Sequence, residues 1–429
     1  MPPTSFASAA AHLAEQADAC DATIAALPPK PVRDDAEHQN ADTASRAMWK
    51  LRDRFMLDHG REVYDLVTAH RTQHLRLGEL AERAARLVPG LLPDAGRLAA
   101  EERLPQAEKE GLAVDHGVFF RRVLADPVCG PHLLDAMRTP TRRALDLLDI
   151  FTAREELDLG TVRLRRSGAV AEVTISNLDC LNAETNELNE DLETAVDLAL
   201  LSPDVQAGVL RGAEMTHPRY AGRRVFSAGI NLKHLHAGRI SFVGFLLGRE
   251  FGLLSKLRRG LLLDSPQRWP LVDETKPWVA AVDTFAIGGG MQILLATDHV
   301  VAAQDAYFSL PAAQEGIVPG MANLRLAALF GGRLTRQVIL SGRRIAATEP
   351  EAALLCDEVV PADQVGAAAT RAAENLASPA VAVNRRMIDL GEEPPDAFRA
   401  YAAEFALAQA LRLHSADVLA KVRRFTTAG

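Results

Sequence analysis

Residues Trp278–Asp298 read WVAAVDTFAIGGGMQILLATD, and this stretch predicts a strand, a glycine turn and a helix. Trp278–Val282 is a short apolar run with β-branched residues, which is typical of a buried strand. Three glycines, Gly288–Gly290, then precede an apolar run without Gly or Pro, which is typical of a helix. The first N–H groups of a helix lack intrahelical partners and lie at its partially positive end. Because glycines let a ligand approach the backbone closely, such a turn can offer N–H donors to an oxyanion, although a purely structural tight turn has the same sequence.

The composition is that of a globular chain with room for more than one domain. Of its 429 residues, 48% are hydrophobic and 24% are charged, and the net charge of −8 argues against a nucleic-acid or anionic-membrane partner. We find no apolar run of membrane-spanning length and no N-terminal signal sequence, and therefore expect a cytoplasmic protein. The four cysteines (Cys20, Cys129, Cys180 and Cys356) are far apart, which favours free thiols over disulfides or a zinc site.

The chain divides into three regions of different character. Residues 1–155 are rich in Ala, Leu, Arg and Glu and predict an all-helical N-terminal domain, with a long helical region over residues 41–88 that begins near Asp42 or Thr43. Over residues 156–364 strands and helices alternate, which predicts an α/β domain of repeated strand-turn-helix units. Its first two strands, Thr161–Arg166 and Ala171–Ser176, are expected to form a hairpin. Residues 365–429 predict a C-terminal helical segment.

Four short motifs in this order carry a family resemblance: Leu181-Asn-Ala, Phe226-Ser-Ala-Gly-Ile-Asn-Leu-Lys, Ile287-Gly-Gly-Gly-Met-Gln and Ile317-Val-Pro-Gly. Together they resemble the crotonase (enoyl-CoA hydratase) superfamily over roughly residues 161–364. The resemblance implies a crotonase fold and a coenzyme A thioester substrate, whose carbonyl oxygen is bound by two backbone N–H groups. By motif position these donors are Ile230 and Gly289. The resemblance also implies a homo-oligomer, either a trimer or a dimer of trimers.

Two positions depart from the hydratases of this superfamily. Those enzymes carry one Glu two residues after the glycine triplet and a second after a Phe-x-x-Pro turn, where this chain has Gln292 and Ala312. A carboxamide cannot act as a general base and a methyl group cannot hold a water molecule, so ordinary hydration is not expected. Glu315 follows three residues after Ala312, and we interpret it as a solvated or capping acid.

A narrower resemblance covers nearly the whole chain. The helical N-terminal region, Gln292 and the segment Gly244–Gly252 (GFLLGREFG) resemble the cofactor-independent arylacetyl-CoA dioxygenases of glycopeptide antibiotic biosynthesis. That family converts 3,5-dihydroxyphenylacetyl-CoA and O₂ to the arylglyoxylate and coenzyme A, so the resemblance implies neither a metal nor an organic cofactor. It also assigns Glu184 to a ring hydroxyl of the substrate, Arg249 to the substrate pocket and Gln292 to orienting substrate or oxygen.

The chemistry agrees with this resemblance, but the residues leave other functions open. Triplet O₂ reacts poorly with closed-shell molecules, and without a metal the substrate must supply an electron, which the α-carbanion of an arylacetyl thioester can do. No residue stands out as the base that removes the α-proton. Two other hypotheses are thioester hydrolysis or isomerisation of an acyl-CoA, and a non-catalytic acyl-CoA-binding protein. His234 and His236 do not share a helix face, so we expect no metal site there.

Overall fold

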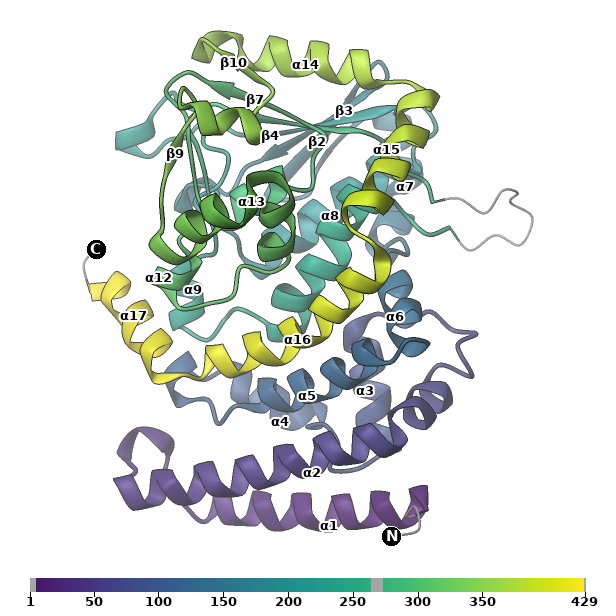
Figure 1. Cartoon of the computed structure of the whole chain (residues 1–429), viewed down its shortest axis with the longest axis vertical. Coiled ribbons are helices and arrows are strands. Elements are labelled where there is room, and N and C mark those ends of the chain that lie inside the picture. Colours follow the sequence, from purple (N-terminus) through teal and green to yellow (C-terminus); the bar gives the residue numbers. More distant parts are fainter. Residues whose placement is uncertain (1–4, 264–272, 428–429) are drawn as a thin grey trace.

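The computed structural model describes residues 5–263 and 273–427 as an N-terminal layer of helices beneath an α/β layer. Figure 1 shows α1 and α2 at one end of the molecule and the strands near the other, with the C-terminal helix α16 (Pro395–Leu413) running between them. Helix α16 packs along α5 (Leu112–Ala125) of the N-terminal layer. The C-terminal part of the chain therefore returns to the N-terminal helices.

The N-terminal region is helical, as the sequence predicted, but its helix boundaries differ. The long helix α2 begins at Asp35, not near Asp42 or Thr43, because Asp34 and Glu37 form a capping box that bonds each other's backbone N–H groups. It ends at Val67 and is separate from the next helix, so the single helical region predicted over 41–88 is wrong. The remaining helices of this layer are α1 (Phe6–Ala25), α3 (Leu77–Leu87), α4 (Ala95–Glu102), α6 (Cys129–Met137) and α7 (Arg142–Arg154).

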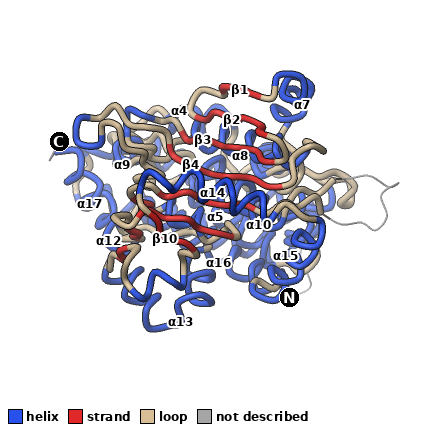
Figure 2. Tube along the Cα trace, turned by 90° about the horizontal axis from the view of Figure 1, so that it is seen from above, coloured by secondary structure: helices blue, strands red, loops and turns tan. Residues whose placement is uncertain are grey.

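Most strands belong to one sheet, in which the described strands follow the order β1-β2-β3-β4-β5-β7-β10. The predicted hairpin is confirmed as the antiparallel pair β2 and β3, and the strands from β3 onward pair in parallel. Figure 2 shows these strands side by side across the α/β layer. They are β1 (Glu156–Asp158), β2 (Val162–Ser167), β3 (Val170–Ile175), β4 (Ala207–Gly212), β5 (Trp278–Val282), β7 (His299–Ala303) and β10 (Glu358–Val360). A smaller sheet pairs β6 (Phe285–Ile287), β8 (Tyr307–Ser309) and β9 (Ile345–Ala346).

Helices follow or connect the strands of the α/β layer. The longer ones are α8 (Asn186–Leu201), α13 (Ala322–Ser341), α14 (Val365–Leu376), α15 (Pro379–Glu392) and α17 (Ala416–Thr427). The shorter α-helices are α9 (Leu232–His236), α10 (Leu254–Arg259), α11 (Gly289–Leu294) and α12 (Ala312–Glu315). Two π-helical segments, η5 (Phe242–Leu247) and η6 (Arg249–Leu253), precede α10. Short 3₁₀ turns are η1 (Lys30–Val32), η2 (Gln106–Glu108), η3 (Leu178–Cys180), η4 (Pro218–Tyr220), η7 (Pro350–Leu354) and η8 (Ala362–Gln364).

The molecule has two large hydrophobic cores. The first contains the sheet and α8, and every residue of β5 is buried in it, which explains the continuous apolar run at Trp278–Val282. The second joins the N-terminal helices to the π-helical segments, through Phe245 and Phe251, and to α16, through Phe398 and Phe405. The π-helical segments and α16 therefore lie where the helical layer meets the α/β layer.

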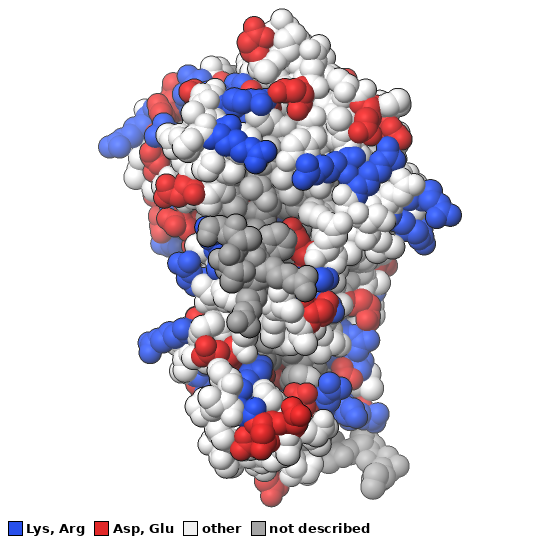
Figure 3. Space-filling view, turned by 90° about the vertical axis from the view of Figure 1, so that its left-hand side faces the viewer, with Lys and Arg blue, Asp and Glu red and all other residues white. Residues whose placement is uncertain are grey.

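The surface carries both signs of charge. Figure 3 shows Lys and Arg interspersed with Asp and Glu over one face of the molecule. All four cysteines are free thiols. No described helix combines the length and the hydrophobicity that a membrane crossing requires.

Glu393, at the junction of α15 and α16, ties the C-terminal helices to the α/β layer. It is 3% exposed, accepts a hydrogen bond from Arg325 Nε at 2.9 Å and forms an ion pair with Arg259 Nη2 at 2.9 Å. Burial alone would raise the pKa of this carboxyl, but the guanidinium groups of Arg325 and Arg259 outweigh it and lower the pKa to about 2.

Replacing Glu393 by Gln should lower the free energy of unfolding by about 3–5 kcal/mol, because two buried guanidinium groups lose their counter-charge. The neighbouring Glu392 forms a more exposed pair with Arg258, so Glu392→Gln should cost about 0–1 kcal/mol. Since the pKa of Glu393 is lowered from 4.5, its stabilisation is present above about pH 4.5 and is lost as the pH falls towards 2. Urea unfolding of both variants at pH 7 and pH 3 measures these free energies. Equal losses of unfolding free energy in the two variants at pH 7 would contradict the role of Glu393.

Candidate active site

The loop before α9 runs beside the glycine turn that follows β6. The Ile287 N–H donates to the Ser227 carbonyl at 3.0 Å, and the Gly288 N–H donates to the Ser309 carbonyl at 2.7 Å. Gly229 and Gly288 have φ values of +83° and +54°, in the region that favours glycine. A Cβ atom on Gly229 would lie 3.0 Å from the Ile287 carbonyl oxygen. Glycine at these positions therefore permits the close approach of the two loops.

The backbone N–H groups of Ile230 and Gly289 have no hydrogen-bond acceptor among the described residues. The segment around Ile230 pairs with Glu184 through two hydrogen bonds. The Glu184 N–H donates to the Gly229 carbonyl at 2.7 Å, and the Asn231 N–H donates to the Glu184 carbonyl at 2.9 Å. Neither bond uses the Ile230 N–H. Gly289 is the first residue of α11, where an N–H has no intrahelical partner. These are the two groups that the sequence predicted as oxyanion donors.

The side chain of Arg249 connects three of the other four predicted site residues. Its Nη2 donates to Glu184 Oε1 at 2.8 Å and to the Gly289 carbonyl at 2.7 Å. Its Nη1 donates to Gln292 Oε1 at 2.6 Å and to Glu250 Oε1 at 3.0 Å. The amide of Gln292 thus faces the cluster and is not a solvent-facing helix amide. One guanidinium group therefore joins η6, the glycine turn, α11 and the segment before α8.

Arg249 and the side chains that it bonds, Glu184, Glu250 and Gln292, form a polar cluster. Its charged members are almost completely removed from solvent. Arg249 and Glu250 are each 3% exposed, and Glu184 is 4% exposed. Burial raises the pKa of Glu250, although Arg249 and the Met321 N–H, which donates to its carboxylate at 2.9 Å, act in the opposite direction. Because breaking a buried ion pair leaves an uncompensated charge, these side chains hold one another in place.

All five predicted site residues line one small cavity at the boundary between the two hydrophobic cores, namely Glu184, Ile230, Arg249, Gly289 and Gln292. Its volume is about 40 Å³, and Phe245, Leu246 and Phe405 supply apolar parts of its wall. Pockets for drug-sized ligands are typically about 300–1,000 Å³, so an aromatic acyl group can enter only if lining side chains move.

The π-helical geometry of η5 and η6 is a feature that the sequence did not reveal. The consecutive residues Arg249 and Glu250 both line the cavity, although side chains of successive residues point about 100° apart in a regular α-helix. π-Helical turns are rare and occur frequently at functional sites. Here the segment supplies both acidic and basic groups to one wall.

The cavity also contains residues to which the sequence assigned no function. Ala312 is buried in its wall at the position of a hydratase glutamate. The interpretation of Glu315 as a solvated or capping acid is wrong, because Glu315 is half-buried, lines the cavity, and has its pKa raised to about 7 by burial. Gln409 reaches the cavity from α16, far along the chain, and no local motif marks it.

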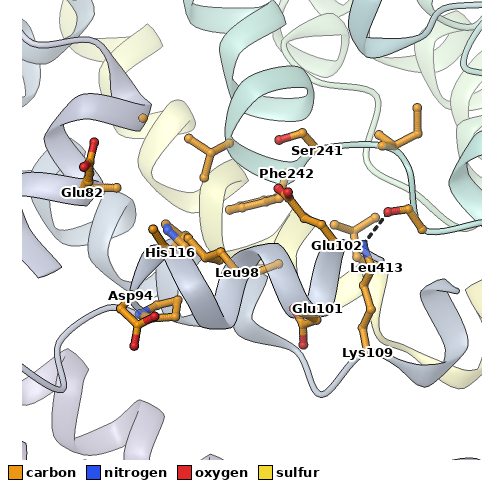
Figure 4. Close-up of a pocket in the computed structure, with 18 of the residues that line it drawn as sticks. Glu82, Asp94, Leu98, Glu101, Glu102, Lys109, His116, Ser241, Phe242 and Leu413 are labelled. Carbon is orange, nitrogen blue, oxygen red and sulfur yellow. Dashed lines mark hydrogen bonds between the residues drawn. The ribbon is translucent and has the colours of Figure 1, made fainter. Parts of the chain in front are cut away.

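A larger cavity of about 710 Å³ lies elsewhere, between the N-terminal helices and η5. Figure 4 shows its acidic side chains, among them Glu82 and Glu102, and Lys109, which donates to the Gly238 carbonyl at 2.5 Å. It contains none of the five predicted site residues, so size does not identify the reactive site. Among the described residues, no three His, Cys, Asp or Glu side chains are arranged to hold a metal ion.

The enoyl-CoA hydratase/isomerase family model matches residues 165–390, more than half of the chain, and the chain therefore belongs to the crotonase family. It is 52% identical to the (3,5-dihydroxyphenyl)acetyl-CoA 1,2-dioxygenase of Amycolatopsis orientalis. The alignment spans 413 residues and covers 96% of this chain and 95% of that protein. It is 29% identical over 241 residues to a short-chain-enoyl-CoA hydratase of Clostridium acetobutylicum, covering 55% of this chain and 83% of that one.

Solved structures agree with the predicted fold. An enoyl-CoA hydratase of Mycobacterium avium subsp. paratuberculosis superimposes with a TM-score of 0.51 at 25% identity, over 62% of this chain and 99% of that chain. The predicted crotonase fold, with its added helical N-terminal region, is confirmed.

Replacing Gly289 by Ala should disrupt the site, because the new Cβ atom would lie 1.8 Å from Glu184 Oε2. Because this clash should displace the Gly289 N–H, we expect kcat/KM for an acyl-CoA substrate to fall about 10²–10³-fold, the usual effect of losing one oxyanion donor. Gly391, on α15, is the matched control, since an added Cβ atom there meets nothing within 4 Å. Wild-type kcat/KM in Gly289→Ala, or an equal loss in Gly391→Ala, would contradict the close packing of Glu184 on this glycine.

Proposed function

We propose that this protein converts 3,5-dihydroxyphenylacetyl-CoA and O₂ to 3,5-dihydroxyphenylglyoxylate and coenzyme A, without a metal or an organic cofactor. The observation that carries the proposal is the combination of two free backbone N–H groups with a cavity in which both hydratase glutamates are replaced. The 52% identity to the dioxygenase of Amycolatopsis orientalis over 96% of the chain supports the same reaction and substrate. A place in glycopeptide antibiotic biosynthesis and a cytoplasmic location stay predictions.

The polar cluster suits a substrate with ring hydroxyl groups. Glu184 is an acceptor and Arg249 a donor, and a phenol can both donate and accept a hydrogen bond. With the ring beside this pair, the thioester oxygen is assigned to the N–H groups of Ile230 and Gly289. Gln292, held by Arg249 Nη1, orients the substrate or the oxygen molecule.

The N–H groups assist the reaction by stabilising the enolate, whose negative charge develops on the thioester oxygen. Loss of one α-proton gives a carbanion that transfers one electron to O₂, and recombination of the two radicals forms an α-peroxide. The peroxide oxygen attacks the thioester carbonyl carbon and expels coenzyme A as the thiolate. Cleavage of the O–O bond with loss of the second α-proton gives the α-keto acid. Apolar wall residues such as Phe245 and Leu246 keep water from the carbanion.

Hydration is disfavoured by the same cavity. Gln292 is a neutral amide whose oxygen is occupied by Arg249, and Ala312 offers only a methyl group to the wall. Neither residue can deliver a proton to a double bond or activate a water molecule.

Oxygen uptake with 3,5-dihydroxyphenylacetyl-CoA tests the proposal most simply. Chelator-treated protein should consume one O₂ for each coenzyme A released, because both come from the same turnover. An oxygen electrode and a thiol assay run in parallel measure this. Coenzyme A release without oxygen uptake would indicate a thioesterase, and a requirement for added metal would contradict the cofactor-independent reaction.

We also propose that the chain forms a homo-oligomer, a trimer or a dimer of trimers, through α15. Val383, Met387 and Leu390 lie at i, i+4 and i+7 on this helix, and Met387 is 62% exposed. An exposed apolar face of this kind is typical of a protein–protein contact.

Met387→Glu should therefore weaken self-association, because it places a charge in the centre of the apolar face. Leu57→Glu makes the same kind of change at an exposed leucine of α2 and should leave the assembly intact. Sedimentation velocity of both variants provides the comparison. A wild-type protein that sediments as a monomer would exclude the oligomer.

A further inference from the structure

Three carboxylates line the active-site cavity, and they differ in how they are bonded. Glu184 and Glu250 are both paired with Arg249 and are held as components of the buried cluster. Glu315, at the end of α12, has no hydrogen-bond or ion-pair partner among the described residues. It is therefore the carboxylate of this cavity whose oxygens are left for a reacting group.

A second polar group at the same cavity is also unpaired. Gln409 is 1% exposed, and its Oε1 accepts a hydrogen bond from the Val318 N–H at 2.9 Å. This bond fixes the orientation of the amide, so Nε2 is the donor side, and Nε2 has no partner among the described residues. Buried polar groups in native proteins are nearly always bonded, so a lone donor and a lone carboxylate at one cavity indicate a place for a polar ligand.

Building on the function proposed above, we propose that Glu315 is the base that removes the α-proton of the arylacetyl thioester. A carboxylate within reach of the bound substrate can take this proton directly. Glu184 and Glu250 cannot do so without breaking their ion pairs with Arg249, which would leave its charge buried and uncompensated. The two replaced hydratase positions supply no alternative, since Gln292 and Ala312 have no basic atom.

The electrostatic surroundings are suited to this role. Helix α12 packs against α13 and α17, and the charged groups named next are bonded to partners other than the Glu315 carboxylate. Arg412 and Lys421 donate to backbone carbonyls of α12 and its C-cap, both are paired with Asp417, and Arg325 of α13 is bound by Glu393. Burial alone raises the pKa of Glu315, to about 7, so the group can accept and return protons near neutral pH.

The proton and electron balance closes with this single base. Glu315 takes the first α-proton as the Cα–H bond breaks and the electron pair passes to the enolate. After the α-peroxide has formed and attacked the thioester, the protonated Glu315 returns that proton to the departing coenzyme A thiolate. The carboxylate then takes the second α-proton as the O–O bond breaks, and it passes that proton to solvent. The substrate carbon loses four electrons and O₂ gains four, so no other oxidant is needed.

Exchange of the α-protons with D₂O in the absence of oxygen tests the role of Glu315 separately from the dioxygenase reaction. Wild-type protein should exchange the α-protons of 3,5-dihydroxyphenylacetyl-CoA, followed by proton NMR. Glu315→Gln should slow the exchange about 10²–10⁴-fold, the usual contribution of a general base, with the Kd for the thioester unchanged. Glu190→Gln removes an exposed carboxylate of α8 that lies outside the cavity and should behave as wild type.

Wild-type exchange in Glu315→Gln, or no exchange in the wild-type protein, overturns the assignment. If Glu315→Gln does not fold, as judged by circular dichroism, the pH dependence of exchange by the wild type decides: a rise through pH 7 supports the carboxylate, and a flat profile from pH 5 to 9 overturns it. Exchange without oxygen uptake would instead remove the dioxygenase function and leave Glu315 as the base. Oxygen uptake by the wild-type protein, together with unaltered exchange in Glu315→Gln, would leave the dioxygenase function and exclude Glu315 as the base.

Discussion

The buried guanidinium group of Arg249 is the interaction on which the geometry of the site depends. It bonds Glu184, Glu250, Gln292 and the Gly289 carbonyl, and so connects parts of the chain more than 40 residues apart at a point that is 3% exposed. A charge can be buried only where its partners are fixed, because desolvation costs several kcal/mol for each ion. The placement of Glu184 and Gln292 is thus coupled to that of the glycine turn.

The two hydrophobic cores of the molecule make different contributions to this site. The sheet and its connecting loops fix the free N–H groups of Ile230 and Gly289. Backbone hydrogen bonds from Glu184 to Gly229 and from Ile287 to Ser227 hold these loops together. The second core supplies the apolar wall, from η5 and α16, where the N-terminal helices pack against the α/β layer. A reaction that passes through a carbanion needs both fixed donors and exclusion of water. In the proposed reaction, the apolar wall from η5 and α16 meets the second requirement.

The sequence predicted the parts of the site that local structure determines. Ile230 and Gly289 were predicted by their motif positions in the family resemblance, and each lies beside glycines that a few residues of sequence reveal. The contact between Arg249 and Glu184 spans 65 residues and the π-helical turn that aims Arg249 has no local signature, so only the resemblance suggested it. Glu315 was misinterpreted because its burial comes from the packing of the C-terminal helices, which periodicity does not reveal. The start of α2 was misplaced because the capping box at Asp34 outweighs the helical pattern that continues beyond it.

In the proposed reaction, both atoms of one oxygen molecule enter the substrate through an enolate, with no metal involved. Turnover of 3,5-dihydroxyphenylacetyl-CoA by chelator-treated protein under ¹⁸O₂ in ordinary water, with mass spectrometry of the product, measures this directly. We expect an arylglyoxylate with two ¹⁸O atoms, one in the keto group and one in the carboxylate, before any exchange of the keto oxygen with water. An initial product with a single ¹⁸O atom, or with none, would contradict it.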